Sequence, residues 1–120
     1  MTSQEGLDGS LQVLIGEKLS SVTFVLDYWQ LDFDGHGFNV MSTITVKDAT
    51  WTVNSGEPGF RDRLCEQLAK IVLYAEFKDN LGVLIAFEDG SSIYLSARLE
   101  DYRGAEAIIF RRRDKGWSVV

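Results

Sequence analysis

Residues 82–96 hold two runs of strand-forming residues on either side of Glu88-Asp89-Gly90-Ser91. Every second residue from Val83 to Phe87 is apolar, and Ile93 and Leu95 continue the pattern after Glu-Asp-Gly-Ser. A period of two places one set of side chains on one face of a strand, and Asp-Gly supplies the positive φ that a tight turn requires. The pattern therefore predicts a β-hairpin.

The same alternation recurs along most of the chain. Trp29, Leu31 and Phe33 precede a second Asp-Gly pair, Asp34-Gly35, which predicts a second hairpin. The alternation changes phase between this set and the preceding one, as expected for a turn or bulge. We predict strands over nine segments: 22–26, 29–33, 38–46, 49–53, 71–78, 82–88, 91–98, 106–112 and 116–120.

Two segments have helical spacing instead. A short helix is predicted near 7–15, where leucines and an isoleucine recur every three or four positions. A second helix near 60–70 is predicted from Phe60, Leu64 and Leu68, which are four residues apart.

The two halves of the chain show a similar order of features. The apolar positions of the first helix match those of the second at an offset of 53 residues, and the two Asp-Gly pairs match at an offset of 55. We therefore predict a single domain, 1–120, with pseudo-repeats at about 7–53 and 60–120. The predicted fold class is α+β: a mostly antiparallel sheet or an open barrel, with the helices over an end or a face.

Composition narrows the class of protein. A chain of 120 residues can bury a core without a metal or a disulfide. Its single cysteine excludes an internal disulfide, which is typical of a reducing compartment, so we expect a cytoplasmic protein. No apolar run approaches the roughly 20 residues that span a bilayer, and the first residues lack the pattern of a signal peptide. The net charge of -6 argues against binding nucleic acid or an anionic membrane.

The negative charge is concentrated in the first half. Residues 1–60 hold two basic and eight acidic residues, whereas residues 61–120 hold ten of each. An acidic segment favours a basic protein partner. We expect Asp27, Asp32 and Asp34 to contact such a partner.

The segment DFDGHG at 32–37 brings two carboxylates and the only histidine of the chain close together. Its spacing does not match a calcium loop, and no second histidine or nearby cysteine completes a zinc site. We therefore expect an exposed turn with Phe33 in the core, and no metal.

The sequence shows no arrangement of residues that is typical of a catalytic cysteine or serine nucleophile. Cys65 falls on the apolar side of the predicted helix, where we expect a small core residue, and His36 is the only imidazole that could activate it or a serine. Neither a GxSxG segment nor a phosphate-binding glycine loop is present. The sequence predicts a non-enzymatic protein without a cofactor.

Two further places are candidates for contact with a partner. Arg111 and Arg113 share a face of a terminal strand and fit an acidic partner, or else they are solvated charges that discourage edge pairing. Tyr102 and Arg103 lie in the connection 100–106 and resemble an interface hot spot, or else Tyr102 closes one end of the core.

Several segments together resemble a group of small uncharacterised bacterial β-rich proteins, some of which are grouped with immunity proteins that neutralise polymorphic toxins. The segments that carry this resemblance are IGEKL, DFDG, LAKIV, FEDGSSIYLS and DYRGAEAIIF. They consist of strand and turn residues, so the resemblance implies a fold and no catalytic position.

The expected function is therefore a protein-interaction domain, in the form of an immunity protein that neutralises a basic toxin. The alternative left open is a small-ligand binding or regulatory domain with a cavity lined by Trp29, Trp51 and Tyr94. An open sheet with residues 106–112 at an edge also favours pairing across a twofold axis, and hence a homodimer.

Overall fold

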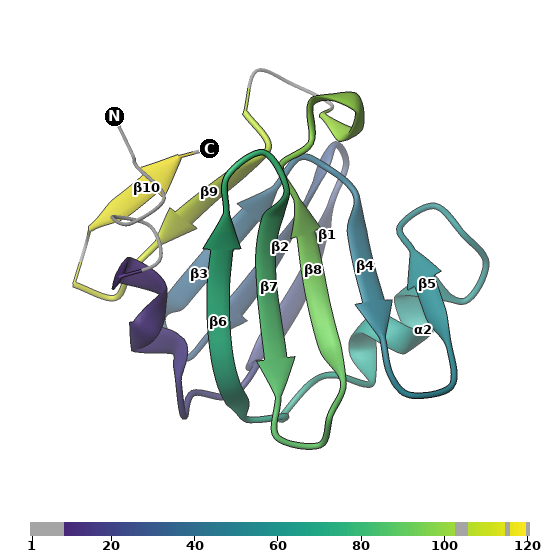
Figure 1. Cartoon of the computed structure of the whole chain (residues 1–120), viewed down its shortest axis with the longest axis horizontal. Helices are drawn as coiled ribbons and strands as arrows, with labels where there is room; N and C mark the ends of the chain where they lie inside the picture. The colour runs from purple at the N-terminus through teal and green to yellow at the C-terminus, as the bar shows by residue number, and fades with distance from the viewer. Residues whose placement is uncertain (1–8, 103–105, 115, 120) are drawn as a thin grey trace.

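The computed structural model describes residues 9–102, 106–114 and 116–119, which form two antiparallel five-stranded sheets packed face to face (Figure 1). The first sheet has the strand order β1-β2-β3-β9-β10, with β1 Ser21–Val25, β2 Tyr28–Phe33, β3 His36–Val40, β9 Ile108–Arg111 and β10 Trp117–Val119. The second sheet has the order β5-β4-β8-β7-β6, with β5 Thr52–Asn54, β4 Ile44–Lys47, β8 Ser92–Ser96, β7 Gly82–Phe87 and β6 Val72–Lys78. The predicted α+β fold of mostly antiparallel sheet is confirmed, and the sheets are open.

Both predicted Asp-Gly hairpins are confirmed. Between β2 and β3, Asp34 and Gly35 have φ values of 52° and 104°, the two positive values of a type I′ turn, whose twist matches that of the flanking strands. Between β7 and β8, Gly90 has a φ of 92°, and the Phe87 amide donates to the Ser91 carbonyl oxygen at 2.9 Å.

The helical segments are shorter than the periodicity predicts. Residues 9–11 are helical and continue into the 3-10 helix η1, Gln12–Leu14, and residue 15 lies in a turn. Residues 7–8 of the predicted first helix lie outside the described residues. Helix α2 spans Phe60–Cys65, and turns follow it over 66–69. Another 3-10 turn, η2, spans Leu99–Asp101. No helix within the described residues is long and apolar enough to cross a membrane.

These short helices close two sides of the core between the sheets. Helix η1 contacts β6, and α2 contacts β4 and β5 (Figure 1). Leu11, Leu14 and Leu64 are fully buried, and Phe60 nearly so. They join one hydrophobic cluster with the inward-facing residues of both sheets, including Phe33, which confirms its predicted core position.

The strands are exchanged between the halves, and this corrects two predictions. The chain leaves the first sheet after β3, is irregular over 41–43, and enters the second sheet as β4, so the continuous strand predicted over 38–46 is wrong. In the second half, the chain leaves β8 in the second sheet and enters the first sheet as β9. Strand β9 lies between β3 and β10, so the predicted edge position of 106–112 is also wrong.

The strand pairs β3–β9 and β8–β4 are related by an approximate twofold axis. On one side Phe38 of β3 lies opposite Phe110 of β9, and on the other Ile93 of β8 lies opposite Val46 of β4, as expected if the two halves swap equivalent strands. A duplicated origin of the halves stays a prediction.

Residues that match at the offset of 53 also pair with each other. Lys18 and Ile71 form an antiparallel bridge. The Gly16 amide donates to the Val72 carbonyl oxygen at 2.9 Å, and the matching bond runs from the Ala69 amide to the Leu19 carbonyl oxygen at 2.8 Å. In a second matched pair, the Leu19 amide donates to the Lys70 carbonyl oxygen at 3.1 Å, and the Val72 amide donates to the Glu17 carbonyl oxygen at 2.9 Å. Lys18 and Ile71 therefore mark the local axis.

Candidate interaction site

Asp32 and Arg111, two of the residues predicted to meet a partner, lie together on the outer face of the first sheet. A Cβ added at Gly37 would lie 2.6 Å from Asp32 Oδ1 and 2.9 Å from Arg111 Nη2, so only glycine leaves room for both side chains. Ser21 Oγ donates to Asp32 Oδ2 at 3.3 Å, and Arg111 Nη2 donates to Asn39 Oδ1 at 3.0 Å. This face is polar and mixes both signs of charge.

Arg113 and Asp34 also meet, through the backbone of the type I′ turn. Arg113 Nε donates to the Asp34 carbonyl oxygen at 2.8 Å, and Arg113 Nη2 lies 3.3 Å from Glu17 Oε2. The Arg113 amide donates to His36 Nδ1 at 3.0 Å. His36 is only 6% exposed, so the expectation that it lies in an exposed turn is wrong, and burial together with the Arg113 charge lowers the pKa of the imidazole.

The remaining predicted contact residues are separate from these. Asp27 is exposed in the turn between β1 and β2, at the other end of β2 from Asp34. Tyr102 is half-buried and packs against the core, while Arg103 lies outside the described residues.

The three aromatic residues proposed to line one cavity lie apart. Trp29 packs edge-on against Phe60 with ring centroids 5.1 Å apart, and Trp51 lies 4.3 Å below the Arg63 guanidinium. Tyr94 lies on the outer face of the second sheet, in a different hollow. Within the described residues, Trp29 and Tyr94 therefore line separate hollows.

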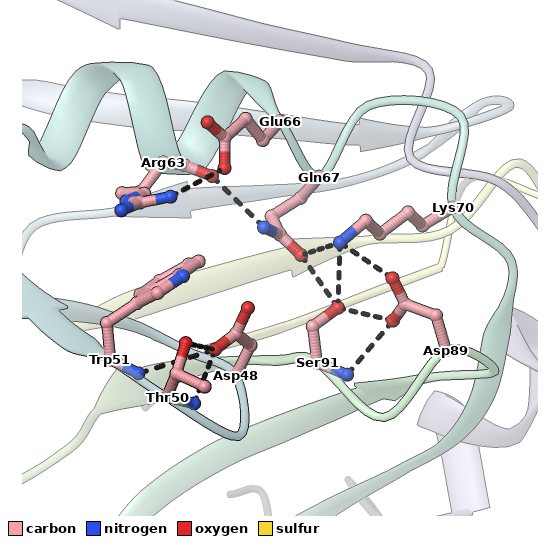
Figure 2. A network of polar contacts seen from close by, with 9 residues as sticks. All are labelled: Asp48, Thr50, Trp51, Arg63, Glu66, Gln67, Lys70, Asp89 and Ser91. Carbon is pink, nitrogen blue, oxygen red and sulfur yellow. Dashed lines mark hydrogen bonds and ion pairs between the residues drawn. The ribbon is translucent and has the colours of Figure 1, made fainter.

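A cluster of polar side chains surrounds Lys70 (Figure 2). Lys70 Nζ lies 2.8 Å from Asp89 Oδ2 and donates to Gln67 Oε1 at 3.1 Å and to Ser91 Oγ at 3.0 Å. The Ser91 amide donates to Asp89 Oδ1 at 2.9 Å. The hydrogen bonds from Lys70, and then those from Ser91, lower the pKa of Asp89 to about 2.

The Ser91 hydroxyl and the Lys70 amine lie together as a serine nucleophile and its base would, but their hydrogen bonds and burial do not suit that role. Lys70 Nζ already contacts three oxygen atoms, and it donates to the serine oxygen in this arrangement. Ser91 is 3% exposed, and its hydroxyl lies 2.6 Å from Asp89 Oδ1 and 2.9 Å from Gln67 Oε1. The cluster instead ties the β7–β8 turn to the segment that follows α2.

A second set of contacts lies at the β4–β5 turn (Figure 2), and the Arg63 guanidinium over the Trp51 ring connects it with the first. Asp48 Oδ1 accepts hydrogen bonds from the amides of Thr50 at 2.7 Å and Trp51 at 3.3 Å, and the bond from Thr50 lowers the pKa of Asp48. Gln67 Nε2 donates to the Arg63 carbonyl oxygen at 3.1 Å. Gln67 is fully buried, although its polar side chain predicts the solvent side of the helix.

Cys65 is exposed, which corrects its predicted core position. Helix α2 ends at Cys65, and its neighbours Leu64 and Gln67 are the residues that face inward. Within the described ranges, no three His, Cys, Asp or Glu side chains gather in a way that could hold a metal ion.

The outer face of the second sheet is hollow and partly apolar, unlike the polar outer face of the first. A hollow of about 600 Å³ has Tyr74, Leu84, Ala86 and Tyr94 on neighbouring strands β6, β7 and β8. Its other lining residues are Thr45, Lys47, Asp48, Ala49, Leu73, Phe87, Gly90, Ser91 and Ser92. Asp48 and Ser91 belong to the polar network, which therefore forms one wall of the hollow.

A smaller hollow continues along the same face toward the β6–β7 turn. It measures about 190 Å³ and shares Leu84 and Tyr94 with the larger one, and its other lining residues are Glu76, Lys78, Leu81 and Gly82. We call the two together the outer-face groove. Leu73, Tyr74 and Leu81 in it are 53%, 44% and 49% exposed, so apolar surface remains in contact with water.

The sequence pattern does not disclose this groove. Leu73 and Tyr74 are consecutive, and strict alternation would place them on opposite faces of the strand. The register of β6 against β7 shifts between Val72 and Tyr74, and a bulge of this kind redirects side chains. The only signal in the sequence is that both are apolar at adjacent positions.

Comparison with known proteins does not place this fold and groove in a family. No protein-family model matches the chain, and neither a curated protein nor a solved structure matches it.

Proposed function

We propose that the protein is a non-enzymatic interaction module that binds an extended segment of a protein partner along the outer-face groove. The observation that carries this proposal is the apolar surface on one sheet face, where Leu73, Tyr74 and Leu81 are exposed and Leu84 and Tyr94 are half-buried. Tyrosine side chains supply a large contact area at low cost in conformational entropy, and tyrosine is enriched at interface hot spots.

The dimensions of the groove fit a short peptide. Strand β7 has six residues, so the groove that follows it is about 20 Å long at about 3.3 Å per residue. An extended segment of about six residues would span it and would turn every second side chain toward Leu84 and Tyr94. We expect apolar residues at those alternate positions.

A toxin-neutralising immunity protein is the specific form of this function that we propose. The net charge of -6 would attract a basic partner and speed its encounter, and the groove would provide the short-range contact. In cells that express a toxin domain encoded by a neighbouring gene, coexpression of the wild-type protein should restore growth, and coexpression of Leu84→Glu should not.

A random peptide library displayed on phage tests the groove directly. We expect selected peptides with alternating apolar residues, and at least about tenfold weaker binding to Leu84→Glu, because a buried carboxylate without a partner is costly. The matched control is Gln30→Glu on the outer face of the first sheet, which should bind as the wild type does. Circular dichroism and thermal melting establish that both variants are folded. Failure to select any peptide, or equal binding by Leu84→Glu, contradicts the proposal.

The second candidate function is a small-ligand site, and a different place favours it. A hollow of about 470 Å³ beside α2 is lined by the Trp29 and Phe60 rings together with Arg61, Asp62 and Glu57. A tryptophan beside one guanidinium and two carboxylates suits a small aromatic molecule with polar groups. A metabolite that raises the melting temperature of the wild type and not of Trp29→Ala would support this function over the first.

A further inference from the structure

The four edges of the two sheets are protected to different degrees. Strand β6 has a bulge, carries Glu76 and Lys78, and its Ala75 carbonyl oxygen accepts a hydrogen bond from Gln12 Nε2 at 3.4 Å. Strands β5 and β10 are three residues long. Strand β1 is five residues long, keeps a regular register with β2, and has no charged side chain or proline. These are the features of an edge that pairs with another strand.

The apolar residues of β1 are also unusually exposed. Phe24 and Val25 are 42% and 36% exposed, and Leu26 in the adjoining turn is 96% exposed. Phe77, which matches Phe24 at the offset of 53 on the protected edge strand β6, is only 3% exposed. Three consecutive exposed apolar residues are uncommon on a surface that faces only water.

The backbone of β1 has two residues that face the free edge. A two-residue turn joins β1 to β2, and Val25 and Tyr28 close it, so they form a hydrogen-bonded pair. Hydrogen-bonded pairs alternate along the ladder, so every second residue of β1 counted from Val25 faces β2. Val22 and Phe24 direct their amide and carbonyl groups outward, and in the described part of the chain neither has a partner for them.

We propose that β1 is the docking site for a second copy of this chain, which pairs antiparallel with it across a twofold axis at Thr23. In this register Val22 lies opposite Phe24 of the second copy, and the two copies together form four backbone hydrogen bonds. A symmetric antiparallel pairing that uses both outward residues must be centred at Thr23. Val22 and Phe24 become an aliphatic–aromatic cross-strand pair, which is a stabilising combination.

The ends of this pairing are complementary as well. Leu26, in the turn that follows β1, comes to the end of the partner strand near Ser20, beside a hollow of about 300 Å³ lined by Lys18, Leu19, Ser20, Asp34, Leu68 and Ala69. Asp27 follows Leu26 in the same turn, and this turn of the second copy lies at the end of the pairing where Lys18 precedes β1. Lys18 and Asp27 are both exposed and have opposite charges, and the twofold axis repeats this match at the other end. The exposed apolar residue and the hollow that accepts it thus belong to one self-complementary surface.

Sedimentation velocity over a range of protein concentrations tests the dimer. We expect the wild type to dimerise and Thr23→Glu to raise the dimer Kd at least about tenfold, because like charges directly opposite each other are destabilising. The control is Thr52→Glu on the exposed edge strand β5, opposite Lys47, which should leave the Kd unchanged. A monomer at every concentration, or a dimer unaffected by Thr23→Glu, overturns the proposal.

A cysteine at the axis supplies a second test that does not depend on weakening the fold. In a Cys65→Ser background, Thr23→Cys should form a disulfide-linked dimer under mild oxidation, since residues of a non-hydrogen-bonded pair have Cα atoms about 4.5 Å apart, within the range of a disulfide. Thr52→Cys in the same background should remain monomeric on a non-reducing gel. Absence of the Thr23→Cys crosslink overturns the proposed register.

Discussion

Gly16 and Ala69 match at the offset of 53 and adopt the same left-handed backbone, which makes them a test of how local strain contributes to stability. Their φ values are 86° and 71°, and both donate equivalent hydrogen bonds across the local axis. Glycine tolerates this conformation, whereas an L-residue with a Cβ is strained in it. Ala69→Gly should therefore stabilise the protein, and Gly16→Ala should destabilise it.

The magnitude follows from two opposing terms. The left-handed conformation costs an L-residue roughly 1–2 kcal/mol, and the greater freedom of glycine in the unfolded chain returns about 0.4–1 kcal/mol of this. Ala69 is exposed, so loss of its methyl group removes little apolar burial, and a Cβ at Gly16 would meet no atom within 4 Å. We expect about 1 kcal/mol of stabilisation for Ala69→Gly and a similar loss for Gly16→Ala.

Urea unfolding followed by tryptophan fluorescence measures both changes. A difference of about 1 kcal/mol moves the midpoint by about 0.5 M urea in a domain of this size and the melting temperature by about 4 °C. The slope of the transition should not change, because neither substitution alters the surface exposed on unfolding. A stability for Ala69→Gly equal to or below that of the wild type would refute the reasoning.

Two further predictions concern other positions. The lowered pKa of His36 means that its neutral form stabilises the fold fully above about 6.5, and this contribution is lost as the pH falls through the lower folded-state value. His36→Asn can still accept the bond from the Arg113 amide and should flatten the pH dependence of the unfolding free energy below about pH 6.5; an unchanged slope would contradict this. Gly82 has a φ of 144°, and Gly82→Ala places a Cβ 2.0 Å from the Leu95 carbonyl oxygen. Calorimetry should therefore show a loss of at least about 3 kcal/mol in the free energy of unfolding. Gly9→Ala, where no atom lies within 4 Å of the added Cβ, is the near-neutral control.

The sequence by itself determined the features that depend on near neighbours. Alternating apolar residues from Val83 to Phe87 become the buried face of β7, and the two Asp-Gly pairs become turns with positive φ. The half-chain offset of 53 pointed to the residues, such as Lys18 and Ile71, that meet at the local axis. These features are predictable because a period of two and the freedom of glycine act within a few residues of one another.

Only the tertiary structure decided which strands are neighbours and which surfaces remain open. Nothing local distinguishes a continuous strand over 38–46 from two strands in different sheets, because both bury the same alternate residues. The burial of His36 and Gln67, the bulge that exposes Leu73, and the free edge of β1 likewise depend on partners far away in the chain. The candidate interaction surfaces arise from these long-range contacts, which is why the charged residues singled out in the sequence did not disclose them.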